Sequence, residues 1–143
     1  MRISLPHKLA LGFTGSIAAA IGAGILFLPQ AFHATSGIVI GNDASLLSEV
    51  RAPGGLLLVA GLFVLAGIFR PRWAYPATVL GFALSATYVL SRLLSMALDG
   101  MPDAALLFAT AIEVCMAAAC GIALLRTGGG RKGARSMEPG AAT

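Results

Sequence analysis

Charged residues are scarce in this sequence. Only 11% of its 143 residues are Asp, Glu, Lys or Arg, whereas a typical soluble domain carries about 25%. Hydrophobic residues make up 57% of the chain, and the mean hydropathy is +0.87. So few charges cannot cover a folded domain with a water-facing surface, which excludes a soluble globular protein. The length allows one domain.

Cysteine and histidine are also rare, which removes most redox and metal motifs. Cys115 and Cys120 do not form a CxxC motif; on a helix they are about 140° apart and cannot bridge, so we expect two buried small hydrophobes. His7 and His33 each lack a second histidine at ligand spacing within their own helix. The glycines at 128–130 follow no strand, so they do not indicate a nucleotide site. We therefore expect no metal, no cofactor and no nucleic-acid partner, and we lean toward a protein that is not an enzyme.

The apolar residues are gathered in four long blocks. About 20 apolar residues cross the hydrocarbon core as a helix, so we predict an all-α integral membrane four-helix bundle over residues 1–126. The predicted helices are about 9–29, 53–70, 76–98 and 104–126. The first block could alternatively be a cleaved signal peptide, because Arg2 and Lys8 precede it and Ala18–Ala20 offers a small-residue cleavage site. Its apolar run continues to Pro29, longer than a signal peptide needs, so we favour a retained helix.

The distribution of Lys and Arg predicts the orientation of the bundle. One side carries Arg2, Lys8, Arg70, Arg72 and the basic tail, and the other carries Asp43, Glu49, Asp99 and Asp103 against Arg51 alone. Because Lys and Arg are enriched in cytoplasmic loops, both termini should be cytoplasmic. The Gly-rich basic tail, residues 127–143, should be disordered.

The outer connection, residues 30–52, should contain a short separate helix near 43–51, with Asn42 or Asp43 as its N-cap. Pro53 would then open the second membrane helix at its first turn, where a missing N–H is harmless. Small residues in the first helix form a seam that favours close helix packing: Gly12, Gly15, Ala19 and Gly22.

The last two helices each carry polar residues at alternating steps of three and four, which places them on one narrow face. On the third helix these are Gly81, Ser85, Tyr88, Arg92, Ser95 and Asp99, and on the fourth Asp103, Leu106, Thr110, Glu113, Ala117 and Cys120. The short turn between them makes the helices antiparallel neighbours. Arg92 then lies level with Thr110, and Glu113 is about 4.5 Å away in depth.

This register predicts an Arg92–Glu113 ion pair inside the membrane. An unpaired arginine near a helix centre costs about 2.5–3.5 kcal/mol, and a bidentate contact would neutralise both charges. Tyr88 should be a hydrogen-bonding partner one turn away. Asp99, nearer the outer surface, could attract a cation or Arg51, so that a polar cleft opens outward. The pair could instead be a structural pin that sets the register of the two helices.

The sequence resembles a bacterial family of membrane proteins. The segments NDASLLSEVRAPGGLLLVAGLFVLAGIFRPRW and LSRLLSMALDGMPD, followed by Glu113, resemble the family catalogued as domain of unknown function 4345. The residues that carry the resemblance are Glu49, Arg51, Gly54, Gly55, Arg92, Asp99, Gly100 and Glu113. The resemblance implies a small multi-pass protein of the bacterial inner membrane with an uncharacterised activity. A more distant similarity to DoxX-like proteins rests on architecture alone.

Two functions compete at this point. The first is an accessory or interaction subunit of a larger membrane protein complex, suggested by the absence of a catalytic set and of a soluble domain. The second is a binder or transporter of a small amphipathic ligand, such as a quinone or a lipid, in the outward-facing cleft. A weaker third option is redox or haem chemistry at His33 or Cys120. The polar cluster that would bind the ligand, or serve as the pin, comprises Tyr88, Arg92, Asp99, Glu113, Glu49 and Arg51.

Overall fold

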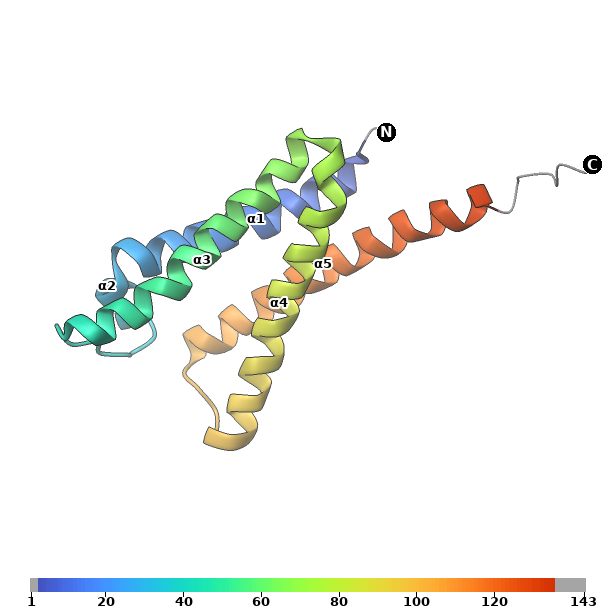
Figure 1. Ribbon diagram of the computed structural model, residues 1–143. Helices are drawn as coiled ribbons and strands as arrows, with labels where there is room; N and C mark the ends of the chain where they lie inside the picture. Colours follow the sequence, from blue (N-terminus) through green and yellow to red (C-terminus); the bar gives the residue numbers. More distant parts are fainter. Residues whose placement is uncertain (1–2, 136–143) are drawn as a thin grey trace, which may run out of the picture.

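The computed structural model describes residues 3–135, with side chains described for residues 3–126. Every regular element in this range is a helix: α1 (Leu5–Phe27), α2 (Pro29–Ala34), α3 (Ala44–Phe69), α4 (Pro71–Asp99) and α5 (Ala104–Arg135) (Figure 1). Within the described chain, α1, α3, α4 and the part of α5 up to Arg126 are long and apolar enough to cross a membrane. The protein is therefore an all-α multi-pass membrane protein with four spans, as the sequence predicts.

Local sequence signals explain where the long helices begin. Asp43 caps α3 by accepting a hydrogen bond from the backbone N–H of Leu46 at 2.8 Å, and Asp103 caps α5 through the N–H of Leu106 at 3.0 Å. Pro71 opens α4 at its first turn, where the missing N–H of proline removes no hydrogen bond. Each cap lies at the start of a membrane span, so a backbone N–H group of the first turn that has no partner within the helix is already hydrogen-bonded where the chain enters the membrane.

The predicted separate helix near 43–51 is wrong, because the structure joins it to the second membrane span as one helix. Pro53 lies inside α3 rather than at its start. A proline in a helix interior removes the hydrogen bond to the residue four positions earlier, here Glu49. Both residues are exposed, so water or lipid headgroups can satisfy the freed carbonyl. Extending a helix that Asp43 has already started then costs less than starting a second one.

Other predicted boundaries also move. The third membrane helix begins at Pro71 instead of 76. Pro76 lies inside α4 and removes the hydrogen bond to the carbonyl of Arg72, an exposed residue whose carbonyl water or lipid headgroups can satisfy. The short α2 was not predicted. The backbone of α5 continues helically over 127–135, where the sequence predicted disorder; propagation of an existing helix needs no new nucleus. The rest of the predicted tail lies outside the described residues.

The four spans form two pairs. α1 and α3 run antiparallel along most of their length, and α4 and α5 form a hairpin through the turn at Gly100 (Figure 1). The two pairs meet where α3 turns into α4. They diverge toward α2 and toward the α4–α5 turn, and no Cα atom of α3 lies within 8 Å of a Cα atom in the described part of α5. The bundle is therefore closed at one end and open at the other.

Glycines bring α1 and α3 into backbone contact. A Cβ atom placed on Gly15 would lie 2.9 Å from the carbonyl oxygen of Gly61, and one on Gly54 would lie 2.9 Å from the backbone nitrogen of Leu26. A Cβ on Gly22 would overlap the backbone of α3 in the same way. In a membrane, close backbone approach of this kind replaces the hydrophobic effect as the source of helix association.

All four spans meet at one level of the closed half. A Cβ atom on Gly81 of α4 would lie 3.2 Å from Thr14 of α1, 3.2 Å from the sulfur of Cys120 of α5, and 3.7 Å from Val64 of α3. Thr14, Val64 and Cys120 are fully buried. We call this level, at Gly81, the floor, because the two helix pairs separate beyond it.

Candidate functional site

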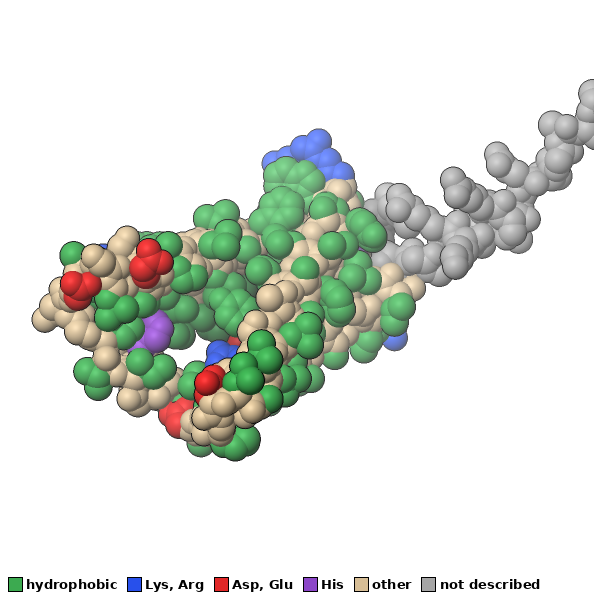
Figure 2. All heavy atoms as spheres, turned by 60° about the horizontal axis from the view of Figure 1, so that its bottom comes forward, with side chains coloured by type: hydrophobic (Ala, Val, Ile, Leu, Met, Phe, Trp, Pro, Cys, Tyr) green, Lys and Arg blue, Asp and Glu red, His purple; other side chains and the backbone are tan. Residues whose placement is uncertain are grey.

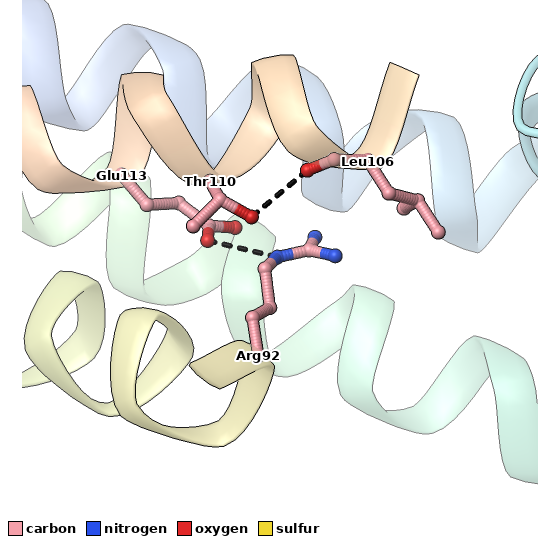
Figure 3. A network of polar contacts seen from close by, with 4 residues as sticks. All are labelled: Arg92, Leu106, Thr110 and Glu113. Atoms are coloured by element: carbon pink, nitrogen blue, oxygen red, sulfur yellow. Dashed lines mark hydrogen bonds and ion pairs between the residues drawn. The ribbon is translucent and has the colours of Figure 1, made fainter. Parts of the chain in front are cut away.

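The structure brings together the two oppositely charged side chains that the sequence placed in register. Nε of Arg92, on α4, donates to Oε2 of Glu113, on α5, at 2.8 Å (Figure 3). The Glu113 side chain is 10% exposed and that of Arg92 is 27% exposed. The α4–α5 turn and the antiparallel register place them at the same depth, beyond the floor at Gly81.

The contact uses one nitrogen of Arg92 instead of the predicted two. No ion pair or hydrogen bond joins the terminal nitrogens Nη1 and Nη2 to any described residue. In Figure 3 these nitrogens point away from Glu113, along α5 toward the end where Leu106 lies. A bidentate contact is therefore not formed, and the outer edge of the guanidinium is left available.

The neighbouring hydroxyl groups bond within their own helices. Thr110 donates to the carbonyl of Leu106 at 2.9 Å (Figure 3), and Ser85 donates to the carbonyl of Gly81 at 2.9 Å. Both residues are buried. Their hydrogens are therefore engaged, and neither side chain competes for the carboxylate of Glu113.

Tyr88 lies near the pair but is not bonded to it. Its half-buried phenol is within electrostatic range of both Arg92 and Glu113. No hydrogen bond from it to a described residue is formed, so the predicted role of Tyr88 as a partner in the pair is wrong in this structure. The phenol hydrogen is a second donor left free at the site.

The remaining residues of the predicted cluster lie apart from the pair. Asp99 is exposed and accepts a hydrogen bond from the hydroxyl of Ser95 at 3.0 Å. Arg51 and Glu49 are exposed on α3, and neither forms an ion pair with a described residue. Arg51 instead lines a shallow groove together with Leu26 of α1 and several residues of α3. The predicted contact between Asp99 and Arg51 is not formed, because the helix pairs that carry them diverge toward this end.

The space between the two helix pairs is a cleft that opens at the diverging end. Figure 2 shows a hollow between the α2–α3 side of the molecule and the end of the α4–α5 hairpin, with basic and acidic side chains beside it. Apolar side chains cover most of the visible surface around this hollow (Figure 2). The cleft therefore combines a small polar region with mostly apolar walls, as ligand sites usually do.

Two buried polar contacts that the sequence did not predict hold the closed half together. The ring of His7, on α1, hydrogen-bonds the hydroxyl of Thr78, on α4, at 2.6 Å. Thr14 and Cys120 are in contact at 3.4 Å between α1 and α5. His7 and Thr14 are seven residues apart, so both lie on one face of α1, and this spacing was the available signal. Cys120 is buried as expected, whereas Cys115 is exposed.

No metal centre is formed by the described residues, since no group of three or more His, Cys, Asp or Glu side chains is close enough to hold an ion. His33 is engaged locally, with Nδ1 2.8 Å from the carbonyl oxygen of Pro29 in α2. The polar side chains that lie together at the α4–α5 pair are Arg92, Glu113 and Tyr88.

The fold and the site together define a class: a small multi-pass membrane protein of four helices with an ion pair between its last two spans. Within that class the chain belongs to a specific family. Residues 6–124 match the family described as Domain of unknown function (DUF4345), which covers all four spans. Searches of the curated proteins and of the solved structures found no match.

Proposed function

We propose that the protein binds a small amphipathic molecule in the cleft between its two helix pairs. The polar end of the molecule would contact Arg92, and its apolar part would lie between the helices. The observation that carries this proposal is the guanidinium of Arg92, which bonds Glu113 through Nε alone, while Nη1 and Nη2 have no partner among the described residues.

This geometry favours a binding site over a structural pin. Placing an arginine in a membrane helix is costly, and a residue selected only to fix helix register would be expected to satisfy as many of its donors as it can. The bidentate contact available to an Arg–carboxylate pair would do so. Arg92 instead presents its outer edge to the open side of the bundle, where a ligand can accept from it.

We also infer that the cleft opens to the outer side of a bacterial inner membrane. Arg70 and Arg72 lie at the α3–α4 turn, with each guanidinium carbon 5.6 Å from the ring centre of Trp73. Basic and aromatic residues together are typical of the cytoplasmic interface. This turn belongs to the closed end of the bundle, so the open end would face away from the cytoplasm.

Extraction of co-purified molecules tests the proposed function. The protein would be purified in a mild detergent, extracted with organic solvent and examined by mass spectrometry, beside a double variant Arg92→Leu/Glu113→Leu. Arg72→Leu, at an exposed position of the α3–α4 turn and away from the pair, is the matched control for loss of an arginine. We expect a defined amphipathic molecule with the wild type and the control, reduced at least tenfold with the double variant. Equal amounts with all three proteins, or none with the wild type, would contradict the proposal.

An accessory or interaction subunit is the second candidate. The observation that favours it is the divergence of the two helix pairs toward the α4–α5 turn (Figure 1), which leaves a space that a helix of a partner could enter. This candidate predicts that a second membrane protein co-purifies in mild detergent at a constant ratio. A single monodisperse species of the size of this chain would count against it.

A further inference from the structure

The polar groups at the cleft have a surplus of hydrogen-bond donors. Arg92 keeps two terminal nitrogens and Tyr88 keeps its hydroxyl without described partners, whereas the hydroxyl hydrogens of Ser85 and Thr110 are used within their helices. Oε2 of Glu113 accepts from Arg92. Oε1 accepts from no described residue, but it belongs to a side chain that is only 10% exposed, against 27% for Arg92, so the donors of Arg92 are the more accessible groups. A molecule that complements this site must mainly accept hydrogen bonds.

The net charge at the site is the second constraint. Arg92 and Glu113 neutralise each other at 2.8 Å, and the carboxylate of Asp99 lies two turns further along the same helix face. An anionic headgroup on Arg92 would therefore meet two carboxylates and one guanidinium that is already paired. It would also have to lose its hydration beside apolar walls, which costs far more for an ion than for a carbonyl group.

A cationic headgroup is disfavoured by the surplus of accessible hydrogen-bond donors. The more exposed free groups of the pair are the terminal N–H donors of Arg92, and an ammonium headgroup has no acceptor to offer them. An uncharged acceptor satisfies both requirements: it takes hydrogen bonds from the guanidinium edge, and it adds no charge to a neutral pair.

We propose that the cleft selects uncharged amphiphiles whose polar end is a carbonyl acceptor, received by Nη1 and Nη2 of Arg92 while Glu113 holds Nε. This inference rests on the proposed function and specifies its ligand class. Quinones, esters and ketones belong to this class, whereas fatty acids, anionic lipid headgroups and alkylammonium compounds do not. Glu113 acts as a positioning residue, because it orients the guanidinium and cancels its charge.

Three probes that share one decyl chain test the ligand class: decyl methyl ketone, decyl carboxylate (undecanoate) and decyltrimethylammonium. The wild-type protein would be placed in phosphatidylcholine nanodiscs at about pH 8, with empty nanodiscs subtracting partition into lipid. Titrations followed by NMR, with the ketone and carboxylate carbons labelled with ¹³C, give the Kd of each. We expect the ketone to bind at least tenfold more tightly than either ion, with its carbonyl resonance shifted downfield by hydrogen bonding.

Two substitutions on α4 link the binding to the guanidinium. Arg92→Lys keeps the charge, but its single ammonium would be occupied by Glu113 and cannot present a second edge, so the ketone Kd should rise at least fivefold. Ser91→Ala, at the exposed neighbouring position, should leave it unchanged. An unchanged Kd with Arg92→Lys would overturn the role assigned to Arg92.

The remaining outcomes separate this inference from the proposed function. Tighter binding of undecanoate or of decyltrimethylammonium than of the ketone, lost in Arg92→Leu/Glu113→Leu, would overturn the neutral-carbonyl class and leave the binding function standing. If the wild-type protein binds every probe no more tightly than the double variant does, the proposed function itself is overturned.

Discussion

At the residue scale, the chain keeps two ionised side chains within a region where each alone is unfavourable. The buried carboxylate of Glu113 is paired through Nε of Arg92, so neither charge is left isolated. Removal of one partner of a buried pair is more harmful than removal of both, because an uncompensated charge remains. This asymmetry makes the pair testable by substitution.

We expect Arg92→Leu to lower the free energy of unfolding in detergent by about 2–4 kcal/mol, because Glu113 is then buried without a partner. Glu113→Leu should have a similar but smaller effect, since Arg92 is 27% exposed and can reach water. The double variant should be more stable than Arg92→Leu. Thermal denaturation of the four proteins measures the coupling between the two sites. Strictly additive losses would show that the two side chains do not stabilise each other.

The His7–Thr78 hydrogen bond gives a second prediction at this scale. Thr78→Val removes the hydroxyl that lies 2.6 Å from the His7 ring while nearly preserving the shape of the side chain. The same hydroxyl donates to the carbonyl of Ala74 at 2.6 Å, so we expect a loss of about 1–2 kcal/mol, of which about 1 kcal/mol comes from the bond to His7. Thr87→Val, at an exposed position of the same helix, is the matched control, and equal melting temperatures for the two variants would contradict a role for this bond.

At the scale of the helices, proline was an inconsistent guide to boundaries, since Pro71 opens α4 but two other prolines lie inside helices. Pro53 lies inside α3 and Pro76 inside α4, although each was predicted to open its helix. A proline signal is local, whereas the end of a helix depends on whether water, lipid or a neighbouring helix satisfies the freed carbonyl. Asp43 and Asp103 were more informative, because their caps satisfy donors that the helix start leaves open.

The packing of α1 on α3 is testable with two adjacent glycines. A Cβ on Gly54 would lie 2.7 Å from Cγ2 of Ile25 and 2.9 Å from the backbone nitrogen of Leu26, whereas a Cβ on Gly55 would meet only Cδ1 of Leu26, at 3.8 Å. We expect Gly54→Ala to destabilise the protein by about 1–3 kcal/mol through overpacking. Gly55→Ala should be neutral or stabilising, since alanine favours the helix. Thermal denaturation in detergent compares them, and equal losses would contradict the α1–α3 packing seen here.

At the scale of the whole molecule, the polar contacts fall into two groups, according to the helices that they join. His7–Thr78 and Thr14–Cys120 join α1 to α4 and α5 in the closed half. The Arg92–Glu113 pair lies within one hairpin, beyond the level where all four spans meet. The first group joins the two helix pairs, whereas the second lies within one pair and does not connect it to the other.

The orientation of the whole molecule is open to direct measurement. We expect a green fluorescent protein fused after Thr143 to fluoresce, because the C-terminus should be cytoplasmic, and alkaline phosphatase at that position to be inactive. The same reporters inserted at Gly41, which is exposed with open space around it, should show the reverse pattern. Active phosphatase after Thr143 would place the mouth of the cleft on the cytoplasmic side.

Much of this architecture could be predicted from local information in the chain. The four spans follow from block hydrophobicity, and the register of Arg92 with Glu113 follows from the helical period and the short turn at Gly100. Both depend on neighbours in the sequence or on one hairpin, for which helix geometry gives distances directly.

Only the tertiary structure decided how the two hairpins meet and what Arg92 leaves unpaired. The backbone contact of Gly15 with Gly61 and the meeting of Thr14 with Cys120 join residues far apart in the chain, and no local periodicity encodes which helix faces approach. Because the two helix pairs diverge toward the α4–α5 turn (Figure 1), Arg51 of α3 does not reach Asp99 of α4, and Arg92 bonds Glu113 through Nε alone. Hydropathy determines that a helix crosses the membrane, whereas steric fit between distant helices determines which polar groups remain free.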